Sequence, residues 1–372
     1  MLHRLVVLAA VCALVARAAP ALEQQALEKK VVLVATPPRF DGDKQVYEIP
    51  RSDIKVDVKF GDKTNSPNIS AVLTLESRTT VGPTTSWIYG ASCTGQSCPT
   101  DATKKYDDST GGTPVSSGGL TGKWFTDTIT IGPAAKLTNV DFVALSQFYQ
   151  DEQYDGLLSL GIGAQHQTVD KLFALGKDPW ITIYTGPTND GQLVIGRNGH
   201  DKCNNAAMWQ VSNGAWEVEK STLEIDGATK KDGISLGFSI TKKSTLIPSD
   251  SFDAVVKDAN YDLSTNTVGD VSKLKSIKIT IGSNSWTLKP EDFSWKDTDG
   301  KVKLQLDRSP DSNPSVTLGV PFLTNRCLVL NGADKDSTKW QVGVGDPKSG
   351  AGVFGLSALL LSVVSVFHFL RL

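Results

Sequence analysis

The stretch IKVDVKF, residues 54–60, alternates apolar and polar side chains without interruption, and this alternation decides the fold class. A β-strand places successive side chains on opposite faces, so a run of this period predicts a strand with one buried face. The same pattern recurs, with Gly, Asn, Asp and Pro between the runs, in AVLTL (71–75), DTITI (127–131), QLVIG (192–196), SIKITIG (276–282), VKLQL (302–306) and WQVGVG (340–345). The sequence therefore predicts an all-β protein.

Helical patterns are few and short. TVDKLFALG (168–176) has apolar residues at helical spacing and ends in Gly, and PSDSFDAVVKDA (248–259) opens with Pro, Ser and Asp. Two later apolar runs, SLGIG (159–163) and TLGVPF (317–322), echo each other. We therefore expect two similar lobes, joined near residues 200–207 where the alternation stops.

Length and charge narrow the class of protein. The chain has 372 residues, enough for two domains or one large bilobal unit with a substantial core. Its formal net charge is -2 and its pI is about 6.1, which gives no electrostatic reason to expect a nucleic-acid partner. No motif for a cofactor is present, and we expect none.

The N-terminal end has the pattern of a secretory signal peptide over residues 1–21. His3 and Arg4 precede an apolar run, Leu5–Leu14, which is followed by small residues suited to cleavage. The run is shorter than the roughly 20 apolar residues that span a bilayer. We expect the mature chain to enter the secretory pathway and to begin with an N-terminal extension, residues 22–52.

The C-terminal end, residues 348–372, has the pattern of a signal for glycolipid (GPI) attachment. Small residues, with Ser349 as the first candidate for attachment and Gly350 as the second, precede an apolar tail. A transmembrane helix over residues 353–370 is the alternative. Either arrangement places the protein on the outer face of the plasma membrane.

Cysteine usage fits an oxidising compartment. Outside the signal peptide the chain has Cys93, Cys98, Cys203 and Cys327, which allow three disulfide pairings. The closeness of Cys93 and Cys98 favours a small loop between them and leaves a long-range pair. Their spacing does not predict a metal site. Asn68 begins the sequon Asn-Ile-Ser and is a candidate for glycosylation.

A series of ordered motifs resembles the pepsin family of aspartic proteases over about residues 54–345. They are SWIYGASC with the following cysteine, GLTGKWFTDTITIG for the flap, YDGLLSLGIG for the family's FDGILGLG, ITIYTGPTNDGQLVIG, and TLGVPFLTNRCLVLN for LGDxFLRxxYxVFD. The resemblance implies a bilobal acid-protease fold with β lobes at residues 53–203 and 204–347. It also places Cys203 and Cys327 where many members have a disulfide.

The family's catalytic positions hold other residues in this chain. The family uses two aspartates, one in a D-T/S-G turn of each lobe, which share a proton across a cleft. Counting back without gaps puts Thr80 and Ser239 at these positions, and Val115 at the flap tyrosine. A hydroxyl does not act as a base at physiological pH. The resemblance therefore implies a fold whose catalysis is lost.

No other side chain is an obvious replacement for the aspartates. Glu76 lies four residues before Thr80, about 13 Å along an extended strand, and Asp108 corresponds to a surface loop of the family. His166 and His200 lie in turn-like segments without a nucleophile motif, and we expect both at the surface.

These observations predict a cell-surface, aspartic-protease-like pseudoprotease that binds a peptide or protein ligand through the interlobe groove or its surface. A membrane-anchored aspartic endopeptidase and a structural surface-coat protein are the alternatives. The oligomeric state is not predicted. The expected groove residues are Thr80, Gly82, Trp87, Val115, Ser239 and Thr241.

Overall fold

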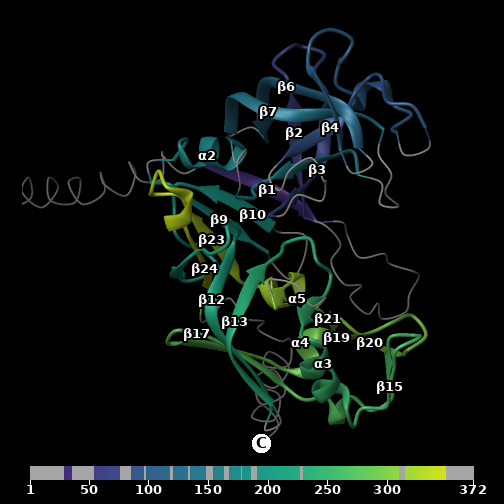
Figure 1. Cartoon of the computed structure of the whole chain (residues 1–372), viewed down its shortest axis with the longest axis vertical. Coiled ribbons are helices and arrows are strands. Elements are labelled where there is room, and N and C mark those ends of the chain that lie inside the picture. The colour runs from purple at the N-terminus through teal and green to yellow at the C-terminus, as the bar shows by residue number, and fades with distance from the viewer. Residues whose placement is uncertain are drawn as a thin grey trace, which may run out of the picture.

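The computed structural model describes residues 29–35, 54–75, 85–95, 98–117, 120–132, 135–147, 154–162, 167–176, 178–185, 191–226, 229–309 and 315–348. Strands account for 51% of the structure and helices for 12%, so the predicted all-β class is confirmed. Figure 1 shows two groups of strands, at the top and bottom of the view, with a further set of strands between them.

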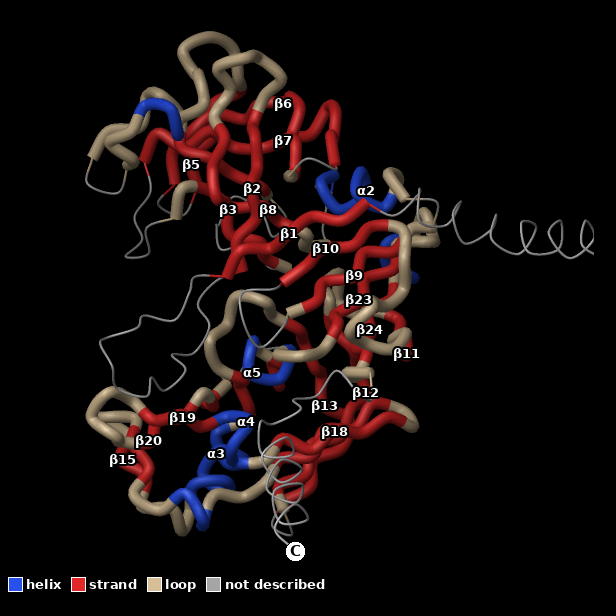
Figure 2. The backbone as a smooth tube through the Cα atoms, turned by 180° about the vertical axis from the view of Figure 1, so that it is seen from behind, coloured by secondary structure: helices blue, strands red, loops and turns tan. Residues whose placement is uncertain are grey.

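Six strands at one end of a 13-stranded sheet join the two halves of the chain (Figure 2). In spatial order they are β11 (Ala207–Gln210), β24 (Gln341–Gly345), β23 (Cys327–Asn331), β9 (Trp180–Tyr184), β10 (Gly191–Ile195) and β1 (Lys29–Ala35). The central pair, β23 and β9, is antiparallel. Each half contributes three strands, and their order is symmetric about this pair, as in a twofold repeat.

The first half continues this sheet into a closed, barrel-like arrangement, because β2 also pairs with β6. Its strands are β2 (Ile54–Phe60), β3 (Asn68–Thr74), β8 (Gly156–Ser159), β4 (Ser86–Tyr89), β7 (Ala135–Gln147), β6 (Leu120–Ile131) and β5 (Thr113–Ser117). The alternation of β2 is confirmed, since Val56, Val58 and Phe60 are all fully buried.

The second half contains a seven-stranded sheet, in the order β18 (Asn284–Leu288), β17 (Ile277–Ile281), β12 (Glu217–Ile225), β13 (Thr229–Phe238), β22 (Val316–Leu318), β14 (Thr245–Ile247) and β21 (Leu306–Arg308). A smaller sheet has the order β15 (Tyr261–Asp262), β16 (Thr267–Val268), β20 (Val302–Leu304) and β19 (Ser294–Lys296).

The helices are short. The two that the sequence predicts are present as α2 (Gln167–Phe173) and α3 (Ser249–Val256). The others are α4 (Pro290–Phe293), α5 (Val320–Leu323) and the 3-10 turns η1 (Ala102–Lys104), η2 (Val271–Lys273) and η3 (Ser337–Lys339). No helix within the described ranges is long and apolar enough to cross a bilayer.

The predicted N-terminal extension contains a strand, and both predicted disulfides are present. Residues 22–52, expected as an N-terminal extension, include β1, which pairs with both β10 and β2. The predicted signal peptide and the attachment residues Ser349 and Gly350 lie outside the described residues. The predicted disulfides, Cys93–Cys98 and Cys203–Cys327, are both present.

Candidate functional site

The loop after β13 forms the first part of the candidate site. Strand β22 runs between β13 and β14, parallel to the first and antiparallel to the second. The chain leaves β13 at Phe238 and enters β14 at Thr245, so residues 239–244 curve past the end of β22. The backbone N–H of Ser239 donates to the carbonyl of Leu318 at 3.0 Å, which fixes the start of this loop.

The Ser239 hydroxyl organises the loop from within. It is fully buried, and its Oγ accepts hydrogen bonds from the backbone N–H groups of Thr241 at 3.3 Å and Lys242 at 3.1 Å. Thr241 is also buried, and its Oγ1 lies 3.3 Å from the same oxygen. An acceptor is therefore needed at position 239 to hold the turn, and here a neutral hydroxyl provides it.

Gly319 allows the loop to pack against the end of β22. A Cβ atom at this position would collide with the backbone carbonyl of Ser244 and would lie 2.8 Å from that of Lys242. The N–H of Val320 donates to the Lys242 carbonyl at 3.0 Å. Only glycine permits this approach of backbone to backbone, so the conformation of residues 239–244 depends on it.

The first half repeats the same arrangement. Strand β8 runs parallel to β3 and antiparallel to β4, as β22 does with β13 and β14. When the pair Trp87 and Leu157 of β4 and β8 is superposed on the pair Leu246 and Thr317 of β14 and β22, Thr74 matches Ser239. Thr74 is fully buried. The internal repeat thus pairs two buried hydroxyl residues, one from each half.

Further hydroxyls surround the end of β8. Ser86 Oγ accepts the backbone N–H of Ser159 at 3.1 Å and lies 3.2 Å from Oγ1 of Thr168. Ser159 Oγ in turn accepts the N–H of Gly161 at 3.2 Å. These buried groups are satisfied by one another, so this part of the site is polar without being charged.

Trp216 connects the two halves beside these positions. Its indole Nε1–H donates to the carbonyl of Leu160 at 2.7 Å, and the Leu160 N–H donates to the carbonyl of Thr74 at 2.8 Å. The carbonyl of Trp216 accepts the N–H of Phe238, which precedes Ser239, at 3.3 Å. This short chain of bonds links the Thr74 and Ser239 segments through Trp216.

The other predicted groove residues have different outcomes. Thr80 and Gly82 lie outside the described residues. Trp87 is buried in β4, and Val115, from β5, is half-buried and packs against the cluster that contains Trp87. Asn68, the predicted glycosylation site, is exposed at the start of β3.

Tyr89 lies in the same cluster as Trp87. The two rings meet edge to face, with centroids 5.4 Å apart. Burial, with a smaller contribution from the charge of Asp155, raises the pKa of the Tyr89 phenol to about 12. Its hydroxyl is buried and has no hydrogen-bond partner within the described part of the chain.

Asp108 lies in a loop whose neighbouring residues 107 and 109–112 are exposed, but its own side chain is buried. One carboxylate oxygen accepts the backbone N–H of Ser92 at 2.9 Å, and the other accepts the Ser92 hydroxyl. The carboxylate packs against Gly90, where a Cβ would overlap it. Asp108 therefore fixes the loop that carries the Cys93–Cys98 disulfide.

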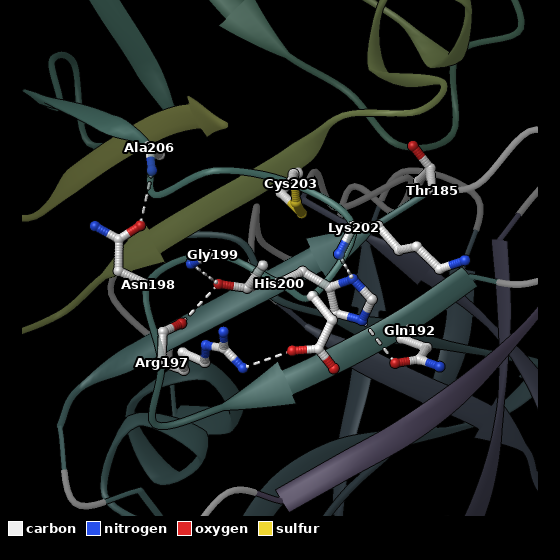
Figure 3. Close-up of a disulfide and its surroundings, with 12 residues drawn as sticks. Thr185, Gln192, Arg197, Asn198, Gly199, His200, Lys202, Cys203 and Ala206 are labelled. Carbon is white, nitrogen blue, oxygen red and sulfur yellow. Dashed lines mark hydrogen bonds and ion pairs between the residues drawn. A yellow bond between two sulfur atoms is a disulfide. The ribbon is translucent and has the colours of Figure 1, made fainter. Parts of the chain in front are cut away.

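His200 is also buried, at 4% exposure, so its predicted surface position is wrong. Figure 3 shows its ring between Lys202 and Gln192, beside Cys203. Nδ1 accepts the backbone N–H of Lys202 at 3.1 Å, and Nε2 lies 2.7 Å from the side-chain oxygen of Gln192, to which it donates. The ring stacks on Tyr184, with centroids 4.7 Å apart. His166 lies outside the described residues.

His200, Cys203 and Cys327 are the one group of potential metal ligands found within the described residues, with ligand atoms within 4.8 Å of one another. The two sulfurs are bonded to each other, and both ring nitrogens of His200 already have hydrogen-bond partners. A metal would require all of these bonds to break, so the arrangement fits a structural role for His200 at the disulfide.

No protein-family model matches this chain, and no curated protein shows a significant sequence match to it. The chemistry of the site must therefore be judged from its own groups. At the loop of Ser239, the buried hydroxyls and backbone donors form hydrogen bonds with one another. The loop offers no group at position 239 that removes a proton from water.

Proposed function

We propose that this protein is a pepsin-like, bilobal member of the aspartic protease family without catalytic activity, and that it binds a peptide or protein ligand between its two lobes. The wider resemblance carries the family assignment, and the internal repeat supports it. In that family each lobe contributes one aspartate at the position that Ser239 holds in the second lobe.

The single observation that carries the loss of activity is the environment of Ser239. Hydrolysis by the family's mechanism requires two carboxylates that share one proton, so that one activates water while the other donates to the carbonyl. Ser239 Oγ is neutral and accepts the backbone N–H groups of Thr241 and Lys242. The turn is thus maintained without the carboxylate, which suits binding rather than hydrolysis.

The direct test is cleavage of a quenched, broad-specificity peptide library by the purified ectodomain, from about pH 3 to about pH 7, the range over which a carboxylate pair titrates. We expect no cleavage from a protein whose unfolding curve shows that it is folded. Cleavage that a pepstatin-like inhibitor blocks would disprove the loss of activity, because such inhibitors bind between two aspartates.

A gain-of-function pair of variants tests the family assignment itself. The double variant Thr74→Asp with Ser239→Asp places carboxylates at the two positions equated by the repeat. We expect it to acquire cleavage at acid pH that is sensitive to a pepstatin-like inhibitor. The matched variant, Thr80→Asp with Ser239→Asp, follows the ungapped sequence count instead. Activity in the second variant alone would place the first-lobe position at Thr80.

The location of the protein is part of the same proposal. We infer that it is held on the outer face of the plasma membrane by a glycolipid joined at Ser349 or Gly350. Exposed Asn68 is compatible with glycosylation on that side. Release from intact cells by a phosphatidylinositol-specific phospholipase is the expected result, and retention after that treatment would favour the transmembrane alternative.

A further inference from the structure

The loop that carries Ser239 also carries two adjacent lysines whose charges are not balanced. Lys242 and Lys243 are both exposed, and neither forms an ion pair with any residue in the described part of the chain. Six other lysines of the described chain do form ion pairs, so these two are free to attract an anionic partner.

The backbone of both lysines is held in place. The Lys242 N–H donates to Ser239 Oγ at 3.1 Å, and the Lys242 carbonyl accepts from Val320 at 3.0 Å. The Lys243 carbonyl accepts from the side chain of Gln305 at 3.3 Å. A ligand that binds here therefore meets two cations on a loop that is already ordered, which lowers the entropic cost of binding.

The residue at position 239 affects the size of the positive charge at this loop. A carboxylate there would lie within hydrogen-bonding distance of the Lys242 backbone and would offset part of the lysine charge. Ser239 is neutral, so it does not offset the positive charge of Lys242 and Lys243. The exposed side of the loop thus carries two cations, which fit carboxylate groups.

We propose that the ligand is an acidic peptide, whose carboxylates bind Lys242 and Lys243 beside the Ser239 turn. This proposal rests on the proposed function, because it names the class of ligand for the same interlobe site. Carboxylate binding by two exposed lysines is sensitive to ionic strength. Binding should therefore weaken as salt is added, more steeply than for a neutral peptide.

The test uses three fluorescent peptides of equal length that differ only at alternate positions. These positions are all Glu in the first peptide, all Gln in the second and all Lys in the third. Fluorescence anisotropy with the intact ectodomain measures their affinities. We expect the Glu peptide to bind most tightly and the Lys peptide most weakly. The double variant Lys242→Glu with Lys243→Glu should bind the Glu peptide about tenfold more weakly. This loss of affinity is equivalent to two exposed ion pairs near the upper end of their usual strength.

The matched control is Lys257→Glu with Lys335→Glu, which changes the net charge equally. These lysines are also exposed and lack ion pairs within the described ranges. We expect the control to leave the preference for Glu unchanged, because long-range effects are screened. A preference that falls equally in both double variants would overturn the assignment to the Ser239 loop. Unfolding curves in urea establish that both variants are folded.

The remaining outcomes separate this proposal from the proposed function. Equal binding of the Glu and Gln peptides, with hydrogen-exchange protection at residues 239–244, would overturn the acidic class and leave peptide binding intact. No binding of any of the three peptides would overturn both. Tighter binding of the Lys peptide would refute the charge argument directly.

Discussion

Replacement of Trp216 by Phe tests how much one indole N–H stabilises the contact between the two halves. The substitution keeps an aromatic ring in the stack with Trp340, whose centroid lies 5.7 Å away, and removes the hydrogen bond to the Leu160 carbonyl. Leu160 is fully buried, so its carbonyl has no route to water. Leaving a buried acceptor unpaired costs about 1–3 kcal/mol.

The matched control is Trp340→Phe. Trp340 is buried to the same extent as Trp216, at 3% exposure each, and belongs to the same stack. Its Nε1–H donates to the carbonyl of Asp334, a partly exposed residue in the same turn region, and water can replace that donor. Both variants lose the same atoms, so the difference between their free energies of unfolding isolates the cost of leaving the buried carbonyl of Leu160 unpaired.

Urea denaturation followed by circular dichroism measures both free energies of unfolding. We expect Trp216→Phe to be less stable than Trp340→Phe by about 1–2 kcal/mol, which is the part of the penalty that solvent cannot relieve. An equal loss in the two variants, or a larger loss in Trp340→Phe, would refute the role of the Trp216 bond in joining the halves.

Three further predictions concern stability. Gly319→Ala forces a Cβ against the carbonyl of Ser244, and we expect a lower melting temperature with a loss of about 2–4 kcal/mol; an unchanged melting temperature would contradict this. Burial raises the pKa of Tyr89 to about 12, so the protonated phenol stabilises the fold below about pH 10, and this stabilisation is lost as the pH rises towards 12. In unfolding curves measured at different pH values, Tyr89→Phe should therefore lack this loss of stability at alkaline pH. Identical pH profiles for the variant and the unchanged protein would be evidence against this prediction. Removing the Cys203–Cys327 disulfide, which joins residues 124 apart in sequence, should lower the free energy of unfolding in denaturant by about 2–5 kcal/mol. This loss should exceed the loss on removing the Cys93–Cys98 disulfide, which closes a short loop, and a larger loss for Cys93–Cys98 would contradict this prediction.

The sequence predicts the strands that have one buried face. The alternation of IKVDVKF is visible because half of its side chains face the core, and β2 follows it residue for residue. The sequence does not predict β1, because KKVVLVA has two lysines followed by an apolar run without alternation. Such a run does not distinguish a strand from a helix, and only the pairing with β10 and β2 identifies it.

The sequence is less informative about buried polar groups. His200 and Asp108 stand in segments rich in turn residues, which favours a surface position. Their burial depends on partners that the local pattern does not reveal, Gln192 for the first and Ser92 for the second. A buried polar residue is stable only with such partners, so its position follows from the fold.

The position equivalent to Ser239 in the first half could not be found by counting residues along the sequence. An ungapped count from Trp87 leads to Thr80, whereas strand pairing equates Ser239 with Thr74. The two solutions differ because a longer segment joins β3 to β4 than joins β13 to β14. Sequence spacing does not reveal where extra residues lie in a loop, whereas the register of paired strands does.

The disulfide between Cys203 and Cys327 has a mechanical consequence. Residues 346–348 run beside residues 202–204, with the N–H of Lys348 donating to the carbonyl of Lys202 at 3.0 Å. A pulling force on the chain beyond Lys348 would first peel this segment away and then unzip β24 and β23. At Cys327 the covalent bond would transfer the load to Cys203. While the disulfide is intact, residues 204–326 lie in a covalent loop that the tension bypasses.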